Sequence, residues 1–316
     1  MPLLTPLKAI YDAMSSAPPA LADKSPAEVR AAMHAMIEQS YFALSAPQDA
    51  LQVERDMAVA VDGAEINLRL YRANPADTLL PCHVYFHGGG FMLGTLDHSD
   101  GYCRMLARSA GCAVVSVDYR LAPEHRFPTA VEDAYAALLW VASHGAELGI
   151  DPATISVGGG SAGGNLAAVV AMLARDRNGP ALVAQVLEIP VTDFTSTAKR
   201  EFPEEGISIG ADKGYAAVYL RNTADASNPM ASPLLAQSLA GLPPALVLCA
   251  EYDQLQPEGE AYAQRLSDAG VPTTYRLLAG QFHGSQGFDT VIPEEVAAYR
   301  SEIVSFLHKA FEKGQE

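Results

Sequence analysis

The segment 158–164, Gly-Gly-Gly-Ser-Ala-Gly-Gly, has the residue types and spacing that serine-based acyl transfer requires. A serine hydroxyl becomes a good nucleophile on a strained strand-to-helix turn, where a base can reach it and a helix N-terminus faces the developing oxyanion. A run rich in β-branched residues at 154–157 precedes the segment, and an alanine-rich helical pattern at 165–174 follows it. We therefore interpret Ser161 as a candidate nucleophile, the alternative being an ordinary glycine-rich β-to-α turn.

The glycines two residues to either side of Ser161 fit the same interpretation. The strand that enters such a turn passes close to the helix that leaves it, so side chains at Gly159 and Gly163 would collide with neighbouring atoms. The serine itself must adopt a backbone conformation that most residues avoid. We predict a nucleophile elbow at this point of the chain.

A second glycine-rich segment, His-Gly-Gly-Gly-Phe at 87–91, follows a predicted buried strand at 82–86. A tetrahedral oxyanion needs preorganised N–H donors, and consecutive glycines let bare backbone amides approach it. We expect the amides of Gly89, Gly90 and Ala162 to form an oxyanion hole. A phosphate-cradling loop is the alternative, but neither a G-x-G-x-x-G pattern nor a P-loop lysine follows. His87 is interpreted as a hydrogen-bonded brace for this loop.

An acid and a histidine follow two later strands. Asp253 comes after the predicted strand 245–249, and His283 lies in Gly-Gln-Phe-His-Gly at 280–284, after the predicted strand 274–278. Taken alone, Asp253 could cap a helix and His283 could be a surface residue. Active sites of open parallel sheets gather at the carboxyl ends of the strands. The order Ser161, Asp253, His283 is that of an α/β-hydrolase triad, and the three residues together predict one.

The elements that must position these residues alternate along the chain. Helices are expected at 26–40, 99–110, 129–144, 165–174, 257–269 and 293–311, and apolar strands at 82–86, 113–117, 155–157, 184–189, 245–249 and 274–278. Apolar strands separated by helices predict βαβ crossovers and a mostly parallel sheet covered on both faces. Two alternating runs within 57–72, around Asp62-Gly63, predict a β-hairpin.

The interval 195–242 interrupts this alternation. It has no buried-strand signal, but it contains a helical patch at 212–220 and a loop with proline and serine at 228–235. We predict an insertion packed over the sheet that forms a helical cap together with the N-terminal helices. The expected organisation is an N-terminal cap segment at 1–50, a catalytic domain at 51–194 and 243–316, and a cap insertion at 195–242.

Composition limits the possible partners. The 316 residues are 49% hydrophobic, which suffices for an extended core. The formal net charge of −16 and the absence of a basic run argue against a nucleic-acid partner. The four cysteines form no C-x-x-C pair. They are expected to be reduced core residues, with Cys82, Cys112 and Cys249 in predicted buried strands and Cys103 elsewhere.

The sequence shows neither a secretory leader nor a window of about 18 apolar residues. We therefore expect a soluble, cytoplasmic protein without a membrane partner. The eight histidines have no metal-ligand spacing such as H-E-x-x-H. No metal and no organic cofactor is expected.

The chain resembles the hormone-sensitive-lipase-like α/β-hydrolase carboxylesterases, bacterial family IV. The resemblance runs from about residue 57 to 311 and is carried by segments 87–91, 118–128, 158–164 and 280–284. It implies an α/β-hydrolase fold with a helical cap, and an acyl-enzyme mechanism on short- to medium-chain acyl esters. It further implies Ser161 as nucleophile, His283 as base, Asp253 as its orienting acid, and the Gly89, Gly90 and Ala162 amides as oxyanion donors. A homodimer is plausible, through the edge strand near 274–278.

The chain departs from the family pattern at three places. Gly160 stands where Asp or Thr is usual, residues 253–257 read Asp-Gln-Leu-Gln-Pro instead of D-P-L-R-D, and loop 284–288 is less apolar. Segment 118–128 is interpreted as a rigid loop that buttresses the elbow. From position alone, the expected pocket residues are Phe91, Tyr215, Leu255 and Phe282.

Other activities fit parts of this pattern. An amidase, a carbamate hydrolase or a xenobiotic deacylase could use the same triad, because the triad does not choose the leaving group. A small-molecule receptor could carry a decayed triad, but all three residues are present. A dehydrogenase would need a dinucleotide fingerprint, and a dehalogenase or epoxide hydrolase would need Asp in place of Ser161.

Overall fold

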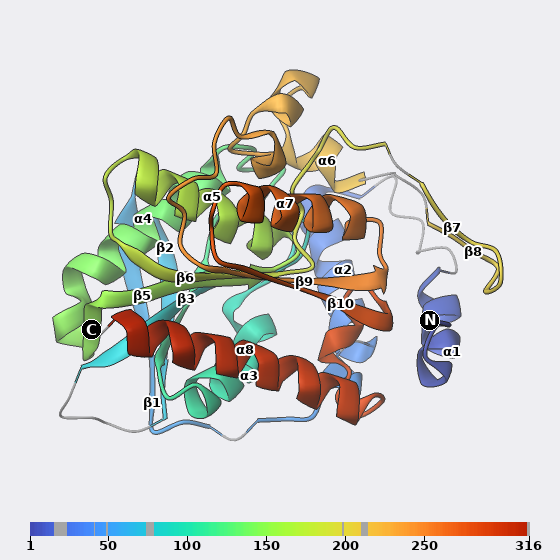
Figure 1. The fold of residues 1–316 in the computed structure, drawn as a ribbon, viewed down its shortest axis with the longest axis horizontal. Helices are drawn as coiled ribbons and strands as arrows, with labels where there is room; N and C mark the ends of the chain where they lie inside the picture. The colour runs from blue at the N-terminus through green and yellow to red at the C-terminus, as the bar shows by residue number, and fades with distance from the viewer. Residues whose placement is uncertain are drawn as a thin grey trace.

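In a computed structural model, residues 1–15, 24–40, 42–48, 50–73, 79–197, 199–209 and 214–314 are described. Within these ranges the chain builds one eight-stranded sheet in the order β1-β2-β4-β3-β5-β6-β9-β10 (Figure 1). Pairing is parallel from β4 to β10, whereas β1 and β2 are antiparallel at one edge. The predicted mostly parallel sheet is confirmed. The strands are β1 Val53–Val61, β2 Ala64–Arg72, β3 Leu80–Phe86, β4 Ala113–Asp118, β5 Ile150–Gly160, β6 Leu182–Glu188, β9 Ala245–Tyr252 and β10 Thr273–Phe282.

Helices cover both faces of this sheet (Figure 1). Successive strand residues point to opposite faces, so Val115 packs in the core under α4, α5 and α7, whereas Val114 packs in the core under α3 and α8. None of the helices in the described ranges is long and apolar enough to cross a bilayer. The bounds are α3 Leu96–Ser109, α4 Thr129–His144, α5 Ala162–Asp176, α7 Gln256–Asp268 and α8 Pro293–Gly314.

The N-terminal part contributes two helices and the hairpin. The predicted helix at 26–40 is α2, Pro26–Ser40, and it is preceded by α1, Thr5–Ser15. The predicted hairpin is formed by β1 and β2 around Asp62-Gly63, with Gly63 at a φ of 69° that favours glycine. Leu3 and Leu7 pack in one buried cluster with Phe282 at the end of β10. This contact places α1 beside the C-terminal end of the sheet.

The interval 195–242 contains a small hairpin that the sequence pattern did not predict, β7 Arg200–Phe202 paired with β8 Ile207–Ile209. Each strand has only three residues, too few for an alternating pattern. Helix α6, Gly214–Tyr219, lies within the predicted helix 212–220, whose first two residues fall outside the described ranges. The 3-10 turns are η1 Phe42–Leu44, η2 Gly145–Leu148, η3 Thr223–Ser227, η4 Pro233–Leu235 and η5 Ser285–Gly287.

The four cysteines are buried and unpaired, as predicted. Cys82 and Cys249 lie in β3 and β9, but Cys112 precedes β4, so its predicted place within a strand is wrong. β4 begins at Ala113, where the strand was expected, and Cys112 lies in the turn by which Gly111, with a φ of 59°, leads the chain out of α3. Burial raises the pKa of Cys103 and of Cys112 to about 12, which keeps these thiols protonated and unreactive.

Candidate active site

Ser161 lies alone between the end of β5 and the start of α5. Its φ of 56° and ψ of −113° fall in a region that residues with a side chain rarely adopt. The Ser161 amide donates to the Glu188 carbonyl at 2.8 Å, and the Ser161 carbonyl accepts from the Asn165 amide at 3.1 Å. These main-chain bonds hold the strained turn, and the serine side chain lines a cavity at the C-terminal end of the sheet.

The flanking glycines are sterically required, as predicted. A Cβ on Gly163 would lie 1.9 Å from the Phe86 carbonyl oxygen, and a Cβ on Gly159 would lie 2.3 Å from the same oxygen. Position 160 differs, because a Cβ there would meet only the Tyr85 hydroxyl, at 3.7 Å. Gly160, before Ser161, therefore leaves open space and relieves no clash.

This contrast gives a stability prediction with a built-in control. Gly163→Ala is expected to lower the free energy of unfolding by about 3 kcal/mol, because the new methyl group would overlap main-chain atoms that cannot rotate away. Gly160→Ala is expected to change it by less than about 0.5 kcal/mol. Denaturant unfolding of both variants checks this. Equal losses for the two variants would contradict the elbow geometry.

His283 joins Ser161 and Asp253 in one hydrogen-bonded chain. The imidazole Nδ1 lies 2.6 Å from Asp253 Oδ2, and Nε2 lies 3.0 Å from Ser161 Oγ. A proton on Nδ1 donates to the carboxylate and leaves Nε2 free to accept from the serine hydroxyl. The fold thus brings together three side chains that follow β5, β9 and β10.

Asp253 is held in place by its own contacts. Asp253 is 2% exposed, and its Oδ1 accepts from the Leu255 amide at 2.9 Å. Arg200 of β7 donates to the main-chain carbonyls of Glu251 and Asp253, so the unpredicted hairpin is tied to the acid loop. Burial lowers the pKa of His283, but the charge and hydrogen bond of Asp253 raise it more, and the net pKa lies above 6.5.

The glycine loop that follows β3 lies beside the elbow. A Cβ on Gly88 would approach the Gly160 carbonyl oxygen to 3.0 Å. Gly89 and Gly90 have φ values of 124° and 60°, which glycine tolerates. The main-chain amides of Gly89, Gly90 and Ala162 donate no hydrogen bond to any of the described residues. Three unused N–H donors therefore occur in the two segments from which the oxyanion hole was predicted.

Segment 118–128 supports the glycine loop. The Tyr119 hydroxyl donates to the His87 carbonyl at 2.8 Å, and the two rings are stacked. The Ala122 amide donates to the Phe91 carbonyl at 2.8 Å. His87 Nδ1 lies 2.8 Å from the Gly88 carbonyl oxygen, and burial lowers the pKa of His87 to about 4. A neutral, fixed imidazole fits the predicted brace.

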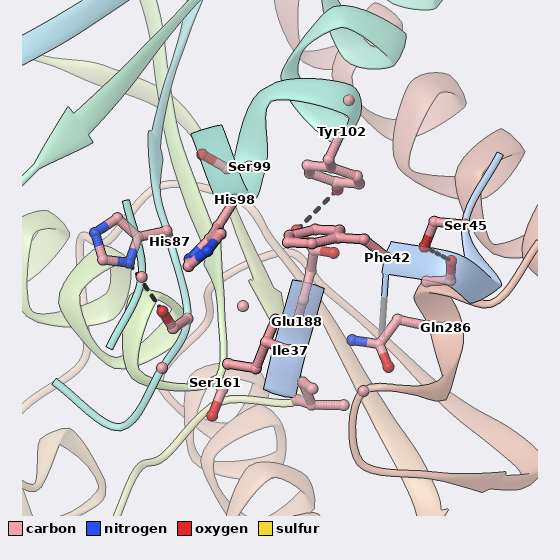
Figure 2. A pocket seen from close by; sticks show the side chains of 18 of the residues that line it. Ile37, Phe42, Ser45, His87, His98, Ser99, Tyr102, Ser161, Glu188 and Gln286 are labelled. Atoms are coloured by element: carbon pink, nitrogen blue, oxygen red, sulfur yellow. Dashed lines mark hydrogen bonds between the residues drawn. The ribbon is translucent and has the colours of Figure 1, made fainter. Parts of the chain in front are cut away.

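A cavity of about 870 Å³ opens over Ser161. Side chains from distant parts of the chain converge on it, among them Ile37 of α2, Phe42 of η1 and Tyr102 of α3 (Figure 2). Tyr215 and Leu255 line this cavity, as expected. The cavity is therefore bounded by the N-terminal segment, the insertion and the sheet edge together.

Two of the four expected pocket residues do not line the cavity. Phe91 is fully buried and stacks on Tyr219 with ring centroids 3.7 Å apart. Phe282 is the last residue of β10 and packs against Phe288 and Tyr11. Phe282 belongs to the buried cluster that also contains Leu3 and Leu7, so its ring is directed away from the cavity although His283 follows it directly.

The residues that sequence reasoning missed include Glu188 and the α2, η1 and α3 side chains of the cavity wall. Glu188 carried a usable signal, because it is the one charged residue of the predicted strand 184–189 and lies near its end. Among the described residues, no group of three or more His, Cys, Asp or Glu side chains could hold a metal ion.

A second serine–histidine pair has no access to this cavity. His83 Nδ1 lies 2.9 Å from Ser156 Oγ, and both side chains are 0% exposed. Burial lowers the pKa of His83 to about 3, and no carboxylate contributes to that shift. This pair packs inside the protein against the sheet, so Ser156 is a control for Ser161: a serine that is bonded to a histidine but has no access to substrate.

Comparisons with known proteins agree with this geometry. A family model described as alpha/beta hydrolase fold matches residues 83–287. An arylesterase of Saccharolobus solfataricus is 40% identical over 254 residues, 78% of this chain and 81% of that protein. Carboxylic ester hydrolase LipN of Mycobacterium tuberculosis is 43% identical over 264 residues, 81% of this chain and 69% of that protein. A solved esterase from Pyrobaculum calidifontis superposes with a TM-score of 0.86 at 38% identity, covering 98% of this chain and 99% of its own.

The chain belongs to the alpha/beta hydrolase fold family, in the hormone-sensitive-lipase-like group that its sequence resembles. The predicted enzyme class, carboxylic ester hydrolase, is confirmed by its relatives and by the esterase fold.

Proposed function

We propose that the protein is a serine carboxylesterase that acts on short- to medium-chain acyl esters through an acyl-enzyme intermediate. The observation that carries the proposal is the continuous chain from Ser161 Oγ through His283 to Asp253, with distances of 3.0 and 2.6 Å. A nucleophile, a base and an orienting acid at hydrogen-bond distance are the parts that covalent acyl transfer needs.

In the first half of the reaction, His283 Nε2 takes the proton of Ser161 as Oγ attacks the ester carbonyl carbon. The carbonyl oxygen becomes an oxyanion that the amides of Gly89, Gly90 and Ala162 stabilise. The imidazolium is stabilised by Asp253. The intermediate collapses when Nε2–H protonates the leaving alcohol oxygen, the bond from carbon to that oxygen breaks, and Ser161 is left acylated.

In the second half, water replaces the alcohol. His283 Nε2 takes a proton from the water molecule as its oxygen attacks the acyl carbon, and the same amides hold the second oxyanion. Collapse returns the proton to Ser161 Oγ and releases the carboxylic acid. The chemistry balances with water as the only co-substrate, and the proposed mechanism calls on no metal or organic cofactor.

The boundaries of the site support a small substrate. We propose that residues 1–50 and 195–242 act as a cap over the catalytic domain, 51–194 and 243–316, because Ile37, Phe42 and Tyr215 line the same cavity as Ser161. A cavity of about 870 Å³ walled on several sides accommodates esters of modest length better than long-chain lipids.

The experiment that tests the function is nitrophenol release from p-nitrophenyl acetate, butyrate, octanoate and palmitate. We expect kcat/KM to be highest for butyrate or octanoate and to fall at least about tenfold for palmitate, whose tail cannot be buried fully. Highest activity on palmitate would contradict the confined pocket. Negligible hydrolysis of every ester, with hydrolysis of matching anilides, would instead favour an amidase.

A further inference from the structure

Glu188 is a buried carboxyl group at the wall of the substrate cavity. It ends β6, is 3% exposed, and lines the cavity that contains Ser161 (Figure 2). Its main-chain carbonyl accepts from the Ser161 amide at 2.8 Å, so the nucleophile and this residue are joined directly through the backbone. The mechanism proposed above does not use its side chain.

The carboxyl group has one hydrogen-bond partner among the described residues. Glu188 Oε1 accepts from the Tyr102 hydroxyl at 2.8 Å, the contact drawn in Figure 2. The two arginines that line the cavity are paired elsewhere, Arg104 with Glu54 and Arg300 with Asp289. Burial raises the pKa of Glu188 to about 8, against the opposite effect of the Tyr102 hydrogen bond. Near neutral pH the group is therefore mostly an uncharged acid with an O–H to donate.

Among the described residues, no main-chain amide donates a hydrogen bond to the Glu188 carboxyl group. Glu258 is a useful comparison, because it is equally buried at 4% exposure but accepts from the amides of Thr192 and Asp193 at 2.8 and 3.2 Å. Glu258 thereby fixes a loop, whereas Glu188 bonds one tyrosine at the cavity wall. A buried polar group without such a structural role is a cost to folding that an apolar residue would avoid.

The space beside Glu188 is open because of Gly160. These two residues are register partners in β5 and β6, so a side chain at position 160 would project on the same face as Glu188. A Cβ at position 160 would meet only the Tyr85 hydroxyl within 4 Å. Tyr85, Tyr102, Gly160 and Glu188 all line the cavity, and they form a polar wall next to the nucleophile.

We propose that Glu188, oriented by Tyr102, is a specificity-determining residue that binds a hydroxyl or carbonyl oxygen of the substrate, so that the enzyme prefers oxygenated esters to plain alkyl esters. The inference rests on the proposed esterase function and names its substrate class. Tyr102 occupies one carboxyl oxygen, and the other oxygen offers its proton to the substrate. A plain alkyl chain in the same place leaves that buried group unpaired, which a site built for hydrogen bonding penalises.

The test compares ester pairs in which a hydroxyl replaces a methyl group of the same size. The acyl series is ethyl 3-hydroxybutyrate against ethyl 3-methylbutyrate, and ethyl 6-hydroxyhexanoate against ethyl heptanoate. The alcohol series is 2-hydroxyethyl butyrate against propyl butyrate. Acid release gives kcat/KM for each ester. We expect the hydroxyl-to-methyl ratio of at least one series to fall about tenfold or more in Glu188→Leu, and the affected series tells which part of the ester reaches Glu188.

Matched variants separate polarity from shape. Glu188→Gln, which keeps a donor and an acceptor, is expected to retain most of the ratio. Ile37→Val, which changes the apolar lining contributed by α2, is expected to change both members of a pair alike. Glu188→Met repeats the test if the leucine variant does not fold, as judged by circular dichroism.

The outcomes distinguish this inference from the function on which it rests. Ratios that stay within about twofold of the wild type in every pair would overturn the role of Glu188 while leaving the esterase intact. Absence of hydrolysis of all esters by the wild-type protein would overturn the esterase itself.

Discussion

Ser161→Ala is expected to lower kcat for p-nitrophenyl butyrate by roughly 10⁴- to 10⁶-fold. The substitution removes the only atom that can form the acyl-enzyme, while the amides of Gly89, Gly90 and Ala162 and the cavity remain. Residual rate enhancement then comes from binding and oxyanion stabilisation alone. KM should change little, because the serine hydroxyl contributes little to ground-state binding.

The matched control is Ser156→Ala. Ser156 also has a histidine within hydrogen-bond distance, His83 at 2.9 Å, but it is buried in the sheet. We expect this variant to lose some stability and to keep kcat within a few-fold of the wild type once folded. Initial rates of both variants, measured at equal concentrations of folded protein, check the prediction. If Ser161→Ala kept more than a tenth of the wild-type activity, Ser161 could not be the nucleophile.

The elbow and the three-residue constellation could be predicted because their requirements are local. Gly159 and Gly163 are needed where main chains nearly touch, and the structure places a hypothetical Cβ at each within 2.3 Å of a carbonyl oxygen. Asp253 and His283 each follow an apolar strand, and parallel strands deliver their ends to one edge. Residue type, spacing and order along the chain therefore sufficed.

The cavity wall could not be predicted in the same way, because its members depend on tertiary packing. Ile37 and Tyr102 reach the site only through the placement of α2 and α3 around the sheet edge. Phe91 shows the limit most clearly, because its φ of 62° directs the ring onto Tyr219 and away from the nucleophile. Sequence proximity to the glycine loop carried no information about that direction.

Glu188 could be predicted only in part from the sequence. Its place near the end of a predicted strand could be read from the sequence, and so could its ionisable carboxyl group. Its protonation could not, because the pKa depends on burial by residues from other elements and on the single bond from Tyr102. The chemical role of a residue at the sheet edge thus requires the packed structure.

Asp253→Asn is expected to lower kcat by roughly 10³- to 10⁴-fold without loss of the fold. The carboxylate accepts from His283 Nδ1 at 2.6 Å, which leaves Nε2 unprotonated toward Ser161. An amide in its place can donate to Nδ1 and so favours the tautomer with its proton on Nε2, which cannot act as the base. Stopped-flow or steady-state hydrolysis of p-nitrophenyl butyrate measures the loss. Asp268→Asn, which removes one exposed charge at the end of α7, is the control and should retain full activity.

The pH profile of the same variant tests the electrostatic part of this assignment. Only the neutral imidazole accepts the serine proton, so kcat/KM falls as pH drops through the pKa of His283. In the wild type, burial lowers this pKa and Asp253 raises it more, so the acidic limb lies at higher pH than an isolated histidine would give. Asp253→Asn removes the charge that raises the pKa of His283 and leaves the burial that lowers it. The acidic limb of kcat/KM should therefore move to lower pH, and the maximal rate should also be lower. Rates between about pH 5 and 9 measure this, and a limb that stays in place would show that the titrating group is not His283 paired with Asp253.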